Sequence, residues 1–134
     1  MRLRSLAVVA GAVVALVAAS LAGAAFTSWK IGGPMALSSA TLAAPTGLSA
    51  SCSNNVAHLS WTATSSTWAD GYEVLRSTTS GGPYTSVALV SGRTTTSYND
   101  SLPGSSRYYY VVRAKKNNWR SANSNETSVE GWSC

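Results

Sequence analysis

The amino-acid sequence predicts an all-β domain of seven strands, folded as a two-sheet sandwich over residues 45–134 of the 134-residue chain. Short segments of alternating apolar and polar residues run through this region, which is the pattern of half-buried strands. Glycine, proline, asparagine and aspartate separate the segments at short intervals, as tight turns require. Seven short strands in about 90 residues fit an immunoglobulin-like sandwich in number and spacing.

The first element along the chain is an apolar N-terminal segment. A short basic head, Arg2 and Arg4, precedes an uncharged run that extends to Trp29, and this order is typical of a secretory signal. The apolar core, residues 6–26, is also long enough to span a bilayer as one hydrophobic helix. Residues 1–26 are therefore interpreted as either a signal peptide or a transmembrane signal-anchor. Both alternatives predict export, with the domain secreted after cleavage or held at the membrane without it.

A flexible linker is expected next, because residues 27–44 mix glycine, serine, alanine and threonine with little periodicity. The strands then follow at residues 47–52, 56–62, 71–77, 84–90, 95–99, 107–114 and 125–131. In the second strand the apolar Leu59 and Trp61 alternate with polar neighbours. In the sixth, Tyr108 and Tyr110 share one face. These faces are expected to meet in the core.

Four motifs within this region match a known family in order and spacing. They read Pro45-Thr46-Gly47-Leu48, Leu59-Ser60-Trp61, Gly71-Tyr72-Glu73-Val74, and Leu102-Pro103-Gly104 with Tyr108 six residues after Leu102. Together they resemble a fibronectin type III domain over the whole of residues 45–134. The resemblance implies that Trp61 is the core tryptophan and that the Tyr108 hydroxyl bonds back to the backbone of the preceding turn. With the strand pattern, it assigns the core to Leu48, Leu59, Trp61, Tyr72, Val74, Leu102, Tyr108, Tyr110 and Val112.

The two cysteines fit an exported protein. Cys52 and Cys134 are the only cysteines, and in an oxidising compartment they are expected to form a disulfide. The resemblance implies that the first and last strands end at the same pole, which brings both cysteines there. The alternative is two inert buried thiols. With the N-terminal segment, these features indicate a bacterial-type exported protein that carries a fibronectin type III domain.

The charge pattern argues against a nucleic-acid partner. The net charge is +5, but Arg2, Arg4 and Lys30 contribute +3 of it. From Pro45 onward seven basic residues stand against five acidic ones, a balance far below that of nucleic-acid-binding domains. The basic character therefore belongs largely to the targeting segment.

The sequence offers no recognisable catalytic set, so we expect neither an enzyme nor a bound metal or cofactor. His58 is the only histidine, and its parity on the second strand, opposite to that of Trp61, predicts an outward side chain. No base accompanies the many serines and threonines. Two thiols with one histidine do not make a zinc site, and no glycine-rich phosphate loop precedes a helix.

One group of residues is a candidate binding platform: Trp68, Lys115, Lys116, Trp119 and Arg120. Trp68 belongs to the expected loop between the second and third strands, and the others to the loop between the sixth and seventh. The resemblance implies that both loops lie at the pole where the domain begins. Indole faces suit sugar rings, and the cations suit carboxylate or phosphate polymers or anionic lipid headgroups. The alternative is that the tryptophans cap the sandwich and the basic run is merely solvated.

These observations predict a non-enzymatic module outside the cytoplasm, at the cell surface, for protein or envelope interaction or for spacing. The alternative is a carbohydrate-binding accessory module that acts through Trp68 and Trp119. Expected partners are a cell-surface protein or a wall polysaccharide, together with the membrane through residues 6–26 if the N-terminal segment is not cleaved.

Overall fold

The computed structural model describes residues 40–134. The predicted signal or anchor at residues 1–26 and most of the predicted linker lie outside the described residues. Within the described part of the chain, no helix has the length and apolarity needed to cross a membrane.

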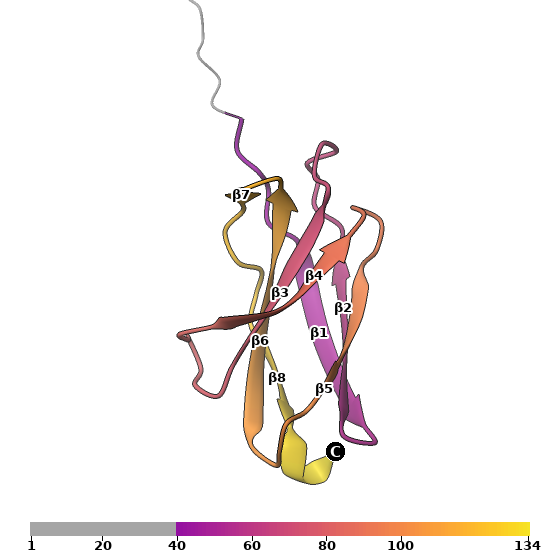
Figure 1. Cartoon of the computed structure of the whole chain (residues 1–134), viewed down its shortest axis with the longest axis vertical. Helices are drawn as coiled ribbons and strands as arrows, with labels where there is room; N and C mark the ends of the chain where they lie inside the picture. The colour runs from indigo at the N-terminus through magenta and orange to yellow at the C-terminus, as the bar shows by residue number, and fades with distance from the viewer. Residues whose placement is uncertain (1–39) are drawn as a thin grey trace, which may run out of the picture. The chain divides into compact units, whose positions relative to one another are not determined.

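Eight antiparallel strands form two sheets that pack face to face (Figure 1). They are β1 (Thr46–Ser53), β2 (Val56–Thr62), β3 (Gly71–Ser77), β4 (Thr85–Ser91), β5 (Ser97–Ser101), β6 (Arg107–Lys116), β7 (Trp119–Arg120) and β8 (Thr127–Glu130), followed by the short 3-10 helix η2 (Gly131–Ser133). One sheet has the order β1-β2-β5 and the other β4-β3-β6. Both β7 and β8 pair with β6 and so share the last edge of the second sheet. The predicted all-β sandwich is confirmed.

The additional strand β7 is the main difference from the predicted pattern of seven strands. The segment expected to be a loop after the sixth strand continues as β6 to Lys116, turns, and pairs back as β7. Asn117 makes this turn with φ of +50°, a left-handed conformation that asparagine adopts more readily than most residues. The predicted bounds of the second and third strands match β2 and β3, and the ends of the other strands shift by two residues or fewer.

The last strand starts later than predicted because Asn125 makes a different contact. Its side-chain Nδ2 donates to the carbonyl oxygen of Leu48 at 2.8 Å, and its Oδ1 accepts from the Leu48 N–H at 2.9 Å. One amide side chain therefore bridges β1 to the chain before β8, across the edge between the two sheets. The predicted end of this strand is instead the 3-10 turn η2.

The core lies between the two sheets. All nine residues assigned to it are buried, with exposed fractions of 6% or less. Trp61 and Tyr72 meet edge to face, with ring centroids 5.3 Å apart. The Tyr72 hydroxyl donates to the carbonyl of Arg93 at 2.6 Å and accepts from the N–H of Thr64 at 3.0 Å. This one side chain thus holds two loops at the same end of the sandwich.

The packed domain begins before residue 45, so the end of the predicted linker is wrong. Leu42 is only 5% exposed and belongs to the core cluster. Its neighbour Ala43 donates its N–H to the Ser66 hydroxyl at 2.9 Å and accepts from the Thr64 hydroxyl at 2.6 Å. The entering chain is therefore fixed to the loop of residues 63–70. Composition alone could not reveal this, because Leu42 is the one apolar side chain buried in the core within residues 40–44, the part of the predicted linker that the structure describes.

The hydrogen bond expected from Tyr108 is also different. Tyr108 is 4% exposed, and its hydroxyl lies 3.5 Å from where a Cβ on Gly104 would stand. Among the described residues this hydroxyl makes no hydrogen bond. The turn is instead tied to the β1–β2 turn, because the Leu102 N–H donates to Asn55 O and its carbonyl accepts from Asn55 Nδ2, each at 2.9 Å.

The disulfide between Cys52 and Cys134 is present, with Cα atoms 5.2 Å apart. It joins the end of β1 to the residue after η2. The Cys134 carbonyl also accepts from the N–H of Asn55 at 3.3 Å. The C-terminus and the β6–β7 hairpin lie at opposite ends of the domain (Figure 1).

Candidate functional site

The candidate site is built on the last residue of the loop before β3. The Asp70 carboxylate accepts from Lys115 Nζ at 2.9 Å and from the N–H of Asn117 at 2.8 Å. Its backbone N–H donates to the Lys115 carbonyl at 3.0 Å. The N–H of Asn117, and then Lys115, hold the pKa of Asp70 below its ordinary value. One residue therefore fixes the loop of residues 63–70 to the β6–β7 hairpin.

This attachment brings the two tryptophans together. The rings of Trp68 and Trp119 have centroids 6.1 Å apart and planes that cross at 84°. Trp119 is 59% exposed and Trp68 is 37% exposed. The two indoles therefore form a corner that is open to solvent, and they do not form a flat platform. With Lys116 and Asn117 they line a pocket of about 260 Å³, which we call the tryptophan pocket.

Two of the three predicted cations form ion pairs within the domain. Lys115 is paired with Asp70, and Arg120 Nε donates to Glu73 Oε2 at 2.7 Å. Arg113 Nε donates to the same Glu73 oxygen at 2.8 Å. Of the predicted cations, only Lys116 lines the tryptophan pocket. Lys115 and Arg120 of the predicted platform are therefore already paired with carboxylates of the domain.

Glu73 holds this ion-pair cluster together on the outer face of the second sheet. The register that places Glu73 opposite Arg113 on β6 supplies the first partner, and β7 supplies the second. Burial alone would raise the pKa of Glu73, but hydrogen bonds from Arg113, Arg120 and Ser86 outweigh it and lower the pKa to about 2. The cluster anchors β7, and with it Trp119, to the middle of the sheet.

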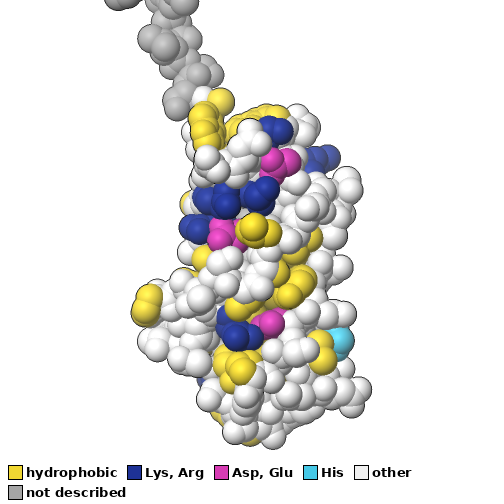
Figure 2. All heavy atoms as spheres, in the orientation of Figure 1, with side chains coloured by type: hydrophobic (Ala, Val, Ile, Leu, Met, Phe, Trp, Pro, Cys, Tyr) yellow, Lys and Arg dark blue, Asp and Glu magenta, His cyan; other side chains and the backbone are white. Residues whose placement is uncertain are grey.

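Charge is divided unevenly along the domain. Within residues 40–134, the half that carries the tryptophan pocket holds five basic side chains and only two acidic ones. They are Arg93, Arg113, Lys115, Lys116, Arg120, Asp70 and Glu73. The other half holds two basic and three acidic side chains, so formal charges of +3 and −1 face opposite ends. Figure 2 shows lysine and arginine side chains concentrated toward the pocket end.

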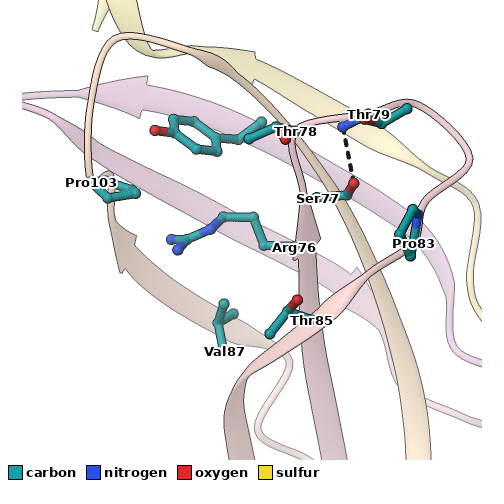
Figure 3. Close-up of a pocket in the computed structure, with 9 residues that line it drawn as sticks. Arg76, Ser77, Thr78, Thr79, Pro83, Thr85, Val87 and Pro103 are labelled. Carbon is teal, nitrogen blue, oxygen red and sulfur yellow. Dashed lines mark hydrogen bonds between the residues drawn. The ribbon is translucent and has the colours of Figure 1, made fainter.

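A second cleft, of about 410 Å³, lies elsewhere, at the open side of the sandwich between the β3–β4 turn and the β5–β6 turn. Arg76 extends into this cleft toward Pro103, with Thr85 and Val87 of β4 on the other side (Figure 3). Its Nη1 donates to Asp100 Oδ2 at 2.6 Å, and its guanidinium lies 5.3 Å from the centre of the Tyr108 ring.

Asp100 is buried beneath the Arg76 cleft and also accepts from the Tyr110 hydroxyl at 2.7 Å. Burial, and then this hydrogen bond, raise the pKa of Tyr110. The arginine is thus neutralised by an internal partner and covers an aromatic core residue. This pair is absent from the predicted site residues, although a charged residue on an apolar strand face is a visible signal of a buried ion pair.

Several other titratable side chains are also engaged within the domain. His58 lies between the Ser53 hydroxyl and Asn99 Oδ1, both at 2.9 Å. Glu126 accepts from the Ser80 hydroxyl, the Gly81 N–H and the Tyr84 hydroxyl, and Glu130 pairs with Arg107. No group of three or more metal-ligating side chains occurs within residues 40–134. These polar contacts brace turns and strand ends.

Comparison with known proteins identifies solved structures that share this architecture. No protein-family model and no curated protein matches the chain. A solved structure described as a Fn3-like protein from Clostridium thermocellum is 42% identical, with a TM-score of 0.58, over 68% of this chain and 94% of that one. That protein consists almost entirely of the matched domain, so the domain exists as a separate folded unit.

In two further similar structures, the matched region is part of a larger protein. Pectate lyase PelI from Erwinia chrysanthemi, solved in complex with tetragalacturonic acid, is 28% identical with a TM-score of 0.52, over 65% of this chain and 28% of the lyase. A β-1,2-glucanase from Parabacteroides distasonis is 26% identical with a TM-score of 0.58, over 72% of this chain and 14% of the glucanase. This chain therefore matches only a minor part of each of these enzymes.

Proposed function

Because the chain belongs to the fibronectin type III family, we propose that its domain is a non-enzymatic interaction module outside the cytoplasm and that the tryptophan pocket is its contact surface. One observation carries the proposal. Trp119 is 59% exposed, yet its position is fixed by Asp70 and by the Glu73 cluster. A large, exposed and rigidly held aromatic side chain is typical of the residues that dominate binding energy.

The proposed location rests on separate observations. A disulfide that joins β1 to the C-terminus favours an oxidising compartment. The apolar segment at residues 6–26 favours export, as a cleaved signal or as an anchor. The described chain enters beside the loop that carries Trp68, as the contacts of Ala43 with Thr64 and Ser66 establish. A retained anchor would therefore be tethered to the domain at the pocket end.

A second candidate function is carbohydrate binding as an accessory to secreted hydrolases. The specific support is that two of the similar structures are enzymes that act on polysaccharides, the pectate lyase and the glucanase. In each enzyme the region that matches this chain is a minor part of the whole protein. Exposed indoles suit the apolar C–H faces of sugar rings, because the aromatic face carries partial negative charge. This candidate uses the same tryptophan pocket.

The experiment is a pull-down of the domain, residues 40–134, on isolated cell wall, on purified polysaccharides and on surface-protein extracts. It is run beside a Trp68→Ala/Trp119→Ala double variant whose fold is checked by circular dichroism. Trp132→Ala is a matched control, because Trp132 is 58% exposed and belongs to η2 beside the disulfide. Retention of the native domain and of the control, with loss for the folded double variant, supports the proposal. Equal retention of all three proteins would contradict the tryptophan pocket as the contact surface.

A further inference from the structure

Resting on the proposed contact surface, we infer that the tryptophan pocket binds an acidic polysaccharide whose pyranose rings carry carboxylates. One ring lies in the corner between Trp68 and Trp119, and its carboxylate faces Lys116. This inference goes beyond the proposed function because it names the chemical class of the partner. It depends on three features of the pocket: its shape, its one available cation and the charge of the surrounding surface.

The shape of the pocket suits a single ring of a longer chain. Indole planes that cross at 84° offer a floor and a wall at right angles. The volume of about 260 Å³ is just below the range of roughly 300–1,000 Å³ that is usual for drug-sized ligands. Flat crystalline polymer surfaces require coplanar aromatic side chains, which this corner does not provide. A soluble or hydrated chain that inserts one unit fits better.

Lys116 supplies a cation at the rim of the corner. Among the described residues, Lys116 has no ion-pair partner, whereas Lys115 is held by Asp70 and Arg120 by Glu73. The side chain of Asn117, which also lines the pocket, makes no hydrogen bond within residues 40–134. The corner is thus bordered by an ammonium group for a carboxylate and by an amide for hydroxyl groups. A ring that carries both substituents uses all of these groups.

The surrounding charge favours an anionic chain over a neutral one. The half of the domain that holds the pocket has a formal charge of +3, and Arg93 and Lys115 lie near the same end. Neighbouring units of an acidic polymer therefore meet a positive surface, while a neutral polymer gains nothing from it. Stable binding to a membrane surface would need a cluster of free basic side chains, since each contributes about 1 kcal/mol, and one free lysine at the pocket falls short of that.

The test uses two ligands with the same sugar backbone: alginate and its propylene glycol ester, in which esterification removes the charge of the carboxylates. Binding to the 40–134 domain is measured by isothermal titration calorimetry at low ionic strength with a calcium chelator. Variants are Lys116→Gln and Trp119→Ala, with Trp132→Ala as the control. Vesicles with an anionic lipid are a separate arm.

We expect alginate to bind about two- to five-fold more tightly than its ester, the range that corresponds to one exposed ion pair. Lys116→Gln should remove most of this preference and keep binding to the ester, while Trp119→Ala should lose binding to both polymers. Equal affinity of the native domain for both polymers would overturn the inference and leave the contact surface in place. Binding through the tryptophans only to neutral glycans, to surface proteins or to vesicles would also overturn the inference, and it would likewise leave the tryptophan pocket as the contact surface. Equal behaviour of native domain and Trp119→Ala toward every probe would overturn the contact surface itself.

Discussion

Both ends of the domain expose tryptophan side chains, but the surroundings of these side chains differ. At the disulfide end, Trp132 lies over the Arg107 guanidinium, 5.7 Å from the ring centre, and Arg107 is paired with Glu130. At the pocket end, Trp119 meets a second tryptophan, and the cation beside it, Lys116, has no ion-pair partner in the described residues. One end places a paired arginine against its exposed indole, and the other leaves the neighbouring lysine without an ion-pair partner in the described residues.

The means of stabilisation differ in the same way. The disulfide end is held by a covalent bond between β1 and the C-terminus. The pocket end is held by ion pairs and hydrogen bonds, chiefly those of Asp70 and Glu73. The two ends are therefore held by different kinds of interaction and can be perturbed separately.

The largest expected effect comes from opening the disulfide end. The bond closes a loop across a sequence separation of 82 residues, and in the chain-entropy model such a bond stabilises by about 4–5 kcal/mol. Cys52→Ser/Cys134→Ser should lower the free energy of unfolding by about that amount, as measured by urea denaturation. Native protein treated with reductant is the control and should behave like the variant. An unchanged urea midpoint would show that the bond merely tethers the C-terminus.

The next effect comes from the ion-pair cluster at the pocket end. Glu73→Gln leaves two arginines without their shared carboxylate and should cost about 2 kcal/mol, in the range for hydrogen bonds to charged groups. Because the pKa of Glu73 is lowered in the folded state, its contribution is present above the ordinary pKa of 4.5 and is lost as the pH falls toward about 2.

Urea denaturation at a series of pH values checks this prediction. Stability of the native domain should fall between about pH 4.5 and pH 2, and Glu73→Gln should flatten the profile in that window. The control is Glu130→Gln at the disulfide end, where both partners are substantially exposed and the pair contributes about 1 kcal/mol or less. Parallel pH profiles for native and Glu73→Gln domains would contradict the role assigned to this carboxylate.

A smaller effect is expected from the tryptophan pair itself. An edge-to-face aromatic pair contributes about 0.5–1.5 kcal/mol beyond the area that it buries. A double-mutant cycle of Trp68→Ala and Trp119→Ala should give a coupling energy in that range. The corresponding cycle of Arg107→Gln and Trp132→Ala should give about 0.5–1 kcal/mol, as for an exposed cation–π contact. A coupling energy of about 3 kcal/mol between the tryptophans would favour the alternative in which they cap the sandwich.

The sequence predicts the sandwich, and its resemblance predicts that both tryptophans lie at one end, because strand alternation and family motifs are local patterns. It does not predict which cations stay free, because that depends on register. No sequence pattern shows that Glu73 pairs with Arg113, because the two residues lie opposite each other only once β3 is placed beside β6. The β6–β7 hairpin was missed for a similar reason. The segment from Lys116 to Trp119 is polar and lacks glycine, and its turn depends on Asn117 in a left-handed conformation.

The smallest effect on global stability, and the most local one, is expected from Asp70. Asp70→Ala removes the acceptor of both Lys115 Nζ and the Asn117 N–H, while the backbone bond from residue 70 to the Lys115 carbonyl can remain. We therefore expect a folded domain of nearly native stability in which the Asn117 amide loses its protection from hydrogen exchange. Tryptophan fluorescence should change as Trp68 and Trp119 separate.

Asp70→Asn separates the two contacts of this carboxylate, since it keeps an acceptor for Asn117 and loses the ion pair. Asn117 should stay protected in this variant if the hairpin is held mainly by that hydrogen bond, which is the first cause of the lowered pKa of Asp70. Because the pKa of Asp70 is lowered in the folded state, the contact weakens once the pH falls below the ordinary pKa of this carboxyl and protonation begins. Acid should therefore reproduce part of the Asp70→Ala effect. If instead Asp70→Ala leaves the Asn117 amide protected and the fluorescence unchanged, the corner is held by packing of the indoles alone. The tryptophan pair would then be as self-contained as the contact of Trp132 with Arg107, and the contrast between the two ends would rest on Lys116 only.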